Sequence, residues 1–150
     1  NVTSRETDWT WVRETTVGET VSMTSWNPYE KCQKSDAYEI PFYQQSPSGK
    51  LIVGVICPDN SLWLYWIDEK GTEFIQLANM PLNVPAEIDK MEFAWSPDDK
   101  FVVFTATSPE HSDLYILNIA EAKKDPVSSP PIKLLSENSM LLNPDWNPRP

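Results

Sequence analysis

The chain has 150 residues, 40% of them hydrophobic, and its 12 Lys and Arg against 22 Asp and Glu give a formal net charge of −10. An electric field of that sign repels phosphate backbones, so the composition argues against nucleic acid as a partner. No apolar run of about 18 residues occurs, so the sequence predicts no membrane-spanning helix.

The N-terminal stretch, residues 1–45, predicts strands without a clear repeat and forms at most a partial structural unit. Its strand-like runs are residues 9–13, 20–26 and 38–44. Trp9, Trp11 and Trp26 lie in this least regular part of the chain. Most aromatic side chains of such a chain pack between sheets, but tryptophan also concentrates in interface hot spots. These three residues are therefore the candidates for contact with a partner.

A five-residue motif then occurs twice, as Ser46-Pro47-Ser48-Gly49-Lys50 and as Ser96-Pro97-Asp98-Asp99-Lys100. An apolar run that predicts a strand follows each copy, at 51–56 and 101–106. The sequence Trp95-Ser96-Pro97 has a further echo in Trp146-Asn147-Pro148. A period near 50 residues is typical of stacked or radial units that bury their apolar faces against one another. The predicted units are 46–95 and 96–146, with 147–150 beginning another.

Each unit contains further strand signals in the same order. A polar turn separates the first strand from a second one, at 62–68 and 114–119, so each pair is expected to form a hairpin. Third strands are predicted at 73–77 and 131–135, and runs at 91–95 and 141–146 lead into the next turn. Residues 120–124 are too short a helical pattern to predict more than a turn. Three or four strands in each repeat is the content of one propeller blade.

The order of turn, apolar strand, polar turn and Asp113-Leu114-Tyr115-Ile116-Leu117-Asn118 resembles the repeat of TolB-like β-propellers. It is also similar to the propeller domains of prolyl-oligopeptidase-type enzymes. Residues 91–120 match most closely, 43–68 match moderately, and 1–40 are included only by inference. The resemblance implies that each Ser-Pro turn links the outer strand of one blade to the inner strand of the next.

The chain departs from the family pattern at two places in these turns. Asp99 replaces the turn glycine, which is tolerable because aspartate visits the left-handed region more readily than most residues. Gln45 stands where Trp95 and Trp146 stand in the later copies, so the first turn lacks its aromatic residue.

The expected fold is all-β, with two to three antiparallel propeller blades. Closed propellers usually have about four to eight blades. The ring is therefore expected to be incomplete, either because the chain is part of a larger propeller or because several copies assemble. A piece of a longer polypeptide is the favoured interpretation, and a sheet that does not close into a ring is the third.

The two cysteines, Cys32 and Cys57, are the best indication of compartment. Since no Cys-x-x-Cys pair or histidine cluster accompanies them, a disulfide is favoured over zinc, with two unpaired thiols as the competing interpretation. Asn1-Val2-Thr3 also forms a glycosylation sequon. Together these features predict an extracytoplasmic location, in the periplasm, at the cell surface or secreted.

Catalytic signals are weak. His111 is the single histidine and is expected to be a solvated turn residue beside Glu110 and Asp113. The chain has no Gly-x-Ser-x-Gly elbow, no glycine-rich phosphate loop and no Asp-x-Asp-x-Asp-Gly loop, so no catalytic residue, cofactor or metal site is predicted. A cation held by turn residues such as Asp59 or Asp98 is the less favoured interpretation.

The expected function is that of a non-enzymatic module for protein–protein binding or scaffolding. Its expected partner is another polypeptide, either further copies of the chain or the rest of a longer one. The alternative is an accessory propeller of a prolyl-oligopeptidase-type hydrolase whose catalytic domain lies elsewhere. A catalytic serine domain in the same gene would favour the alternative, and further repeats with a signal peptide would favour the binding module.

Overall fold

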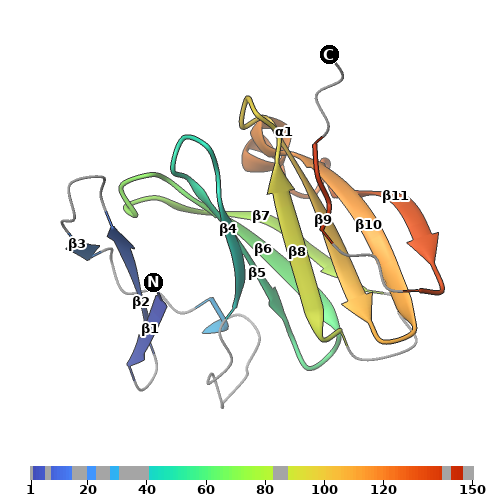
Figure 1. The fold of residues 1–150 in the computed structure, drawn as a ribbon. Coiled ribbons are helices and arrows are strands. Elements are labelled where there is room, and N and C mark those ends of the chain that lie inside the picture. Colours follow the sequence, from blue (N-terminus) through green and yellow to red (C-terminus); the bar gives the residue numbers. More distant parts are fainter. Residues whose placement is uncertain are drawn as a thin grey trace.

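The structure, a computed structural model, describes residues 2–5, 8–14, 20–22, 28–30, 41–82, 88–139 and 143–146. These residues are mostly β-strand and form three antiparallel sheets, none of them closed, which confirms the all-β class (Figure 1). No helix in these residues is long and apolar enough to cross a membrane.

The smallest sheet comes from the N-terminal stretch and has the order β1-β2-β3. Its strands are β1 (Val2–Arg5), β2 (Asp8–Glu14) and β3 (Thr20–Ser22). β2 contains the predicted strand 9–13, and β3 starts where the strand 20–26 was expected.

The first large sheet has the order β4-β5-β6-β7, so each strand pairs with its neighbour in sequence. Its strands are β4 (Phe42–Gln45), β5 (Leu51–Ile56), β6 (Ser61–Ile67) and β7 (Phe74–Pro81). β5 and β6 form the predicted hairpin, with Ile56 opposite Leu62 across the polar turn. Asn60 takes a positive φ of 64° there, a conformation that asparagine tolerates well.

The second large sheet repeats this arrangement in the order β8-β9-β10-β11. Its strands are β8 (Lys90–Trp95), β9 (Phe101–Ser108), β10 (His111–Asn118) and β11 (Ile132–Glu137). The predicted hairpin of β9 and β10 is confirmed, with Ser108 opposite His111.

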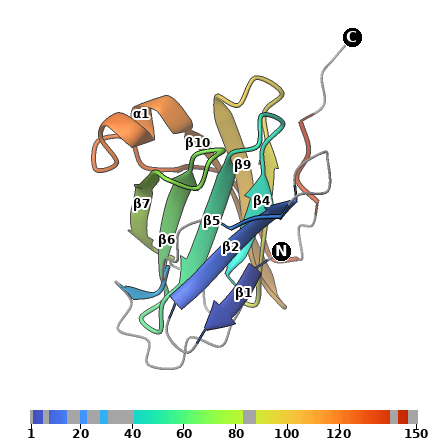
Figure 2. The same ribbon diagram turned by 90° about the vertical axis from the view of Figure 1, so that its left-hand side faces the viewer.

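Helix α1 (Ile119–Lys124) corrects the expectation of a simple turn at 120–124. Asn118 caps its N-terminus by accepting a hydrogen bond from the backbone N–H of Glu121 (3.1 Å). Ile119 and Ala122 are buried in the core, and α1 lies against β7 of the first large sheet (Figure 2). A six-residue helix is marginal alone, so its stability comes from this packing.

The two Ser-Pro turns connect strands within a sheet. Residues 46–50 join β4 to β5 and residues 96–100 join β8 to β9, which corrects the implied link between two blades. Gly49 (φ 91°) and Asp99 (φ 58°) occupy the same left-handed position in their turns, as the replacement of glycine by aspartate predicts.

The main hydrophobic core lies between the two large sheets, which stand face to face in Figure 1. From the first sheet it contains Ile52, Leu62, Leu64, Trp66 and Leu77; from the second it contains Phe93, Trp95, Val102, Phe104, Tyr115 and Leu117. The opposite face of the first sheet forms a smaller cluster of Tyr29, Val53, Val55, Tyr65 and Ile67. Neither large sheet therefore buries its apolar side chains alone.

Candidate functional site

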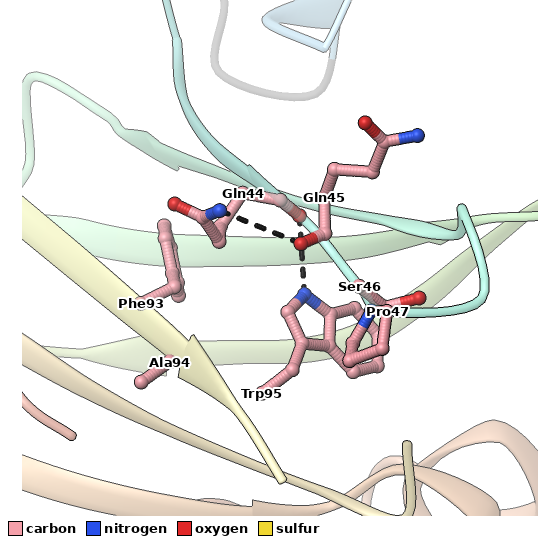
Figure 3. A pocket seen from close by; sticks show the side chains of 7 residues that line it. All are labelled: Gln44, Gln45, Ser46, Pro47, Phe93, Ala94 and Trp95. Carbon is pink, nitrogen blue, oxygen red and sulfur yellow. Dashed lines mark hydrogen bonds between the residues drawn. The ribbon is translucent and has the colours of Figure 1, made fainter. Parts of the chain in front are cut away.

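A groove of about 540 Å³ lies where the two large sheets bring their first strands together. β4 and β8 are the edge strands of their sheets and contact each other without joining into one sheet. Seven residues from these strands and the first Ser-Pro turn line the groove (Figure 3): Gln44, Gln45, Ser46, Pro47, Phe93, Ala94 and Trp95.

Trp95 links the two edge strands β4 and β8 at this groove through a hydrogen bond. Its indole N–H donates to the backbone carbonyl of Gln44 (3.1 Å), and its side chain is only 7% exposed. The contact recurs one repeat later, where the Trp146 indole N–H donates to the carbonyl of Ala94 (2.8 Å). The repeated tryptophan therefore has a structural role: Trp95 docks β8 onto β4, and Trp146 docks the segment 143–146 onto β8.

The first and second Ser-Pro turns also contact each other directly. The carboxylate of Asp99 accepts hydrogen bonds from the hydroxyl groups of Ser48 and Ser46, the latter at 3.3 Å. Lys50 Nζ lies 3.7 Å from the same carboxylate oxygen. Since Ser46 lines the groove, this contact holds one wall of the groove in place.

The side chains that line the groove are uncharged. Its side chains are amides, a hydroxyl, a proline ring, a methyl group and two aromatic rings, none of which titrates near neutral pH. The exposed amide of Gln44 is only weakly engaged, since its Nε2 donates to the carbonyl of Gln45 at 3.4 Å. Such a surface can supply apolar contact and hydrogen bonds to a bound molecule.

A second polar cluster surrounds the fully buried carboxylate of Asp113 on β10. Four side chains contact it: Ser136 Oγ donates at 2.6 Å, His111 Nε2 lies at 2.9 Å, Lys133 Nζ at 3.0 Å and the Tyr115 hydroxyl at 3.3 Å. His111 and Tyr115 belong to β10, and Lys133 and Ser136 to β11.

These contacts move two pKa values in opposite directions. Burial pushes the pKa of Asp113 upward, but hydrogen bonds from Ser136, Lys133 and His111 outweigh it, and the pKa falls below its usual value. Burial and the adjacent Asp113 carboxylate raise the pKa of the Tyr115 hydroxyl. The hydrogen bonds around Asp113 therefore favour its ionised form.

Serine, histidine and aspartate meet in this cluster, but their hydrogen bonds are not arranged as in a hydrolase triad. In a triad the aspartate and the serine bind opposite nitrogens of the imidazole. Here Asp113 Oδ1 (2.9 Å) and Ser136 Oγ (3.3 Å) both face His111 Nε2, and the Ser136 hydroxyl donates a hydrogen bond to Asp113. His111 is also only 15% exposed, so the expectation of a solvated turn residue is wrong.

Of the three tryptophans predicted to contact a partner, the structure describes two. Trp9 and Trp11 occupy alternate positions of β2, opposite Ser4 and Val2, while Trp26 lies outside the described residues. The sequence missed the groove and the Asp113 cluster.

The structure describes only one of the two cysteines of the predicted disulfide. Cys57 is 5% exposed and is not a free thiol. Cys32 lies outside the described residues, so the pairing of the two cysteines stays a prediction.

The acidic turn residues are engaged locally. Asp59 accepts from the Ser61 hydroxyl (2.6 Å) and Asp98 from the Ser96 hydroxyl (2.7 Å). Within the described ranges, no three histidine, cysteine or acidic residues gather in a way that could hold a metal ion.

Comparison with known proteins adds no identification, since no family model, curated protein or solved structure matches the chain. The resemblance to TolB-like propellers therefore depends on the residues quoted above and stays a prediction.

Proposed function

We propose that the chain is a TolB-like β-propeller module that binds another polypeptide and has no catalytic activity of its own. The observation that carries this proposal is the groove between the two edge strands β4 and β8, with its uncharged lining of amides and aromatic rings.

Edge strands present backbone N–H and C=O groups that pair readily with a further polypeptide segment. Extended segments use these groups for affinity, and pockets between alternate side chains supply specificity. At the groove, Gln44 offers a side-chain amide on one wall, and Phe93 with Trp95 offers aromatic surface on the other, whereas the side chain of Gln45 points away from Trp95. The proposed ligand is therefore an extended, uncharged stretch of polypeptide.

Two observations support the propeller interpretation. The two large sheets share one core, and the contact of Trp95 with Gln44 recurs in that of Trp146 with Ala94. Radial repetition of sheets is how propellers bury both faces of each blade. We place the module outside the cytoplasm, because Cys57 is not a free thiol and disulfides persist in oxidising compartments.

The binding proposal is tested by selecting peptides from a displayed random library on the whole chain. A photo-reactive amino acid at Gln44 is expected to cross-link the selected peptides, whereas the same group at Val127, which is 88% exposed and outside the groove, is not. Gln44→Lys is expected to weaken binding, with Val127→Lys as the matched control. Equal cross-linking at both positions, or equal affinity of the two variants, would contradict the groove as the binding site.

A further inference from the structure

The outer strands of the two large sheets, β7 and β11, match each other position by position. Each pairs with its neighbouring strand through a bulge, and the bulge falls in the same place, next to Leu64 in the first sheet and next to Leu114 in the second. The register on either side of the bulge therefore defines which residues of the two strands correspond. The matching residues are Ile75 and Ile132, Leu77 and Leu134, and Ala78 and Leu135.

These matching residues are apolar in both strands, but they are covered only in the first sheet. Leu77 is fully buried and Ala78 is 2% exposed. In contrast, Ile132 is 64%, Leu134 is 54% and Leu135 is 42% exposed. We call these three residues of the second sheet the β11 patch. Neighbouring exposed apolar side chains of this kind mark interaction sites.

Helix α1 covers the matching surface on the first sheet. It lies against β7, and its buried residues Ile119 and Ala122 belong to the same hydrophobic cluster as Leu77 and Ala78 (Figure 2). Within the described residues α1 is the one α-helix, so no helix covers β11 at the outer edge of the second sheet (Figure 1). The β11 patch is thus the counterpart of a surface to which a helix is bound.

We infer that the β11 patch binds a short amphipathic helix of another polypeptide, as β7 binds α1. The ligand comes from another polypeptide because the chain's own helix is held on β7 by the burial of Ile119 and Ala122. The surface is separate from the groove between β4 and β8, so this inference does not depend on the proposed function.

The contact of α1 with β7 also indicates what the bound helix presents. Residues three positions apart lie on one face of a helix, as Ile119 and Ala122 do. The ligand is therefore expected to carry an aliphatic side chain and, three positions later, a small one. It needs no lysine, because Ile116 stands where Trp66 carries the ammonium group of Lys123 in the first sheet.

The experiment uses the full-length chain and a peptide made from α1. The peptide spans residues 117–126 and is held helical by a hydrocarbon staple between positions 120 and 124, which are exposed in α1. It is titrated into a chain that is isotope-labelled in its isoleucine and leucine methyl groups, and the methyl chemical shifts are followed. A peptide with Ile119→Asp is the matched control ligand, and Leu77, whose surface α1 already covers, is the internal control.

We expect the methyl signals of the β11 patch to shift with the first peptide, while those of Leu77 stay in place. The Ile119→Asp peptide should shift neither. Leu134→Asp in the chain should weaken binding by roughly tenfold or more, because its carboxylate would be buried without a partner. Leu135→Asp repeats the test if the first variant does not fold.

Two results would overturn the inference. One is the absence of shifts in the β11 patch, or equal shifts with the two peptides. The other is movement of the same signals when the chain is diluted without peptide, which would show that the patch is an interface between copies of the chain.

Discussion

Lys123 holds its ammonium group 3.4 Å from the centre of the Trp66 ring. The two residues come from different repeats, because Lys123 belongs to helix α1 and Trp66 to strand β6. Trp66 is almost fully buried, so the lysine stem covers an aromatic surface of the first large sheet while its charge rests on the ring. The helix that the sequence did not predict is therefore a direct link between the two sheets.

Replacing Lys123 by methionine keeps the apolar stem and removes the charge. We expect the free energy of unfolding to fall by about 1–2 kcal/mol, the value of a desolvated cation–π contact. Lys124→Met, at the exposed neighbouring position, is the matched control and should change it little. Urea unfolding followed by circular dichroism measures both, and equal losses in the two variants would refute a specific contact.

Gly54 lies on β5 and faces Phe93 on β8 of the second large sheet. A Cβ atom there would meet Phe93 Cζ at 2.9 Å and Leu64 Cδ2 at 3.3 Å. We expect Gly54→Ala to lower the free energy of unfolding by roughly 1–3 kcal/mol through overpacking. Phe93→Leu removes the clashing atom, so the double variant should lose less than the sum of the single losses. Additive losses in this double-mutant cycle would contradict the predicted clash.

The repeated tryptophan contacts predict that the same substitution at Trp95 and at Trp146 destabilises the fold by a similar amount. Trp95→Phe and Trp146→Phe each keep an aromatic ring but delete the N–H that bonds to Gln44 or Ala94. Each should reduce the free energy of unfolding by about 0.5–1.5 kcal/mol, the net value of one hydrogen bond. Denaturant unfolding of both variants tests this, and a loss for only one of them would show that the two contacts are not equivalent.

The Asp113 cluster predicts a stability that depends on pH. Folding lowers the pKa of Asp113 below its ordinary value of 3.8, so the ionised group stabilises the fold above that value. The contribution is lost as the pH falls through the lowered pKa of the folded state. Asp113→Asn should therefore be less stable than the parent at neutral pH, and the difference should shrink in acid.

The comparison with the parent chain is essential, because Asp59, Asp68, Glu92, Asp98 and Asp125 also have lowered pKa values. Thermal unfolding of both chains over the acid range isolates the part that belongs to Asp113. A constant difference at all pH values would contradict the assignment.

Cys32 and Cys57 are predicted to form a disulfide. Alkylation without a reductant should leave the intact mass of the chain unchanged, and alkylation after reduction should add two groups. The bridge would close a loop of about 25 residues and stabilise the fold by roughly 3–4 kcal/mol in the chain-entropy model. Two alkylated cysteines without reductant would refute the bridge and weaken the proposed location outside the cytoplasm.

The strands were predictable because their signals are local. The apolar runs that became β5 and β9 are bounded by turn residues, and Asp99 keeps the left-handed turn that glycine adopts in the first copy. Helix α1 was not predictable, since six residues have too little intrinsic helical stability and the burial of Ile119 and Ala122 depends on another part of the chain.

The candidate sites depend on contacts that no local pattern contains. The period of the repeat marks Trp95, but not that its indole reaches the carbonyl of Gln44, 51 residues earlier. In the same way, Lys133 and Ser136 meet at Asp113 only because a bulge in β11 sets the register of its pairing with β10. The alternation of apolar and polar residues in the sequence does not predict where a bulge lies.

The single core between the two large sheets makes the repeats energetically inseparable. Ile52 and Leu64 on one side are buried by Phe93 and Phe104 on the other, so a chain cut between β7 and β8 would expose apolar surface on both pieces. Unfolding of this part should therefore be cooperative, and the half-chains should fold only when mixed. A repeat of this kind can be lengthened or shortened during evolution only by whole sheets, because each inserted sheet must supply one face to each of its neighbours.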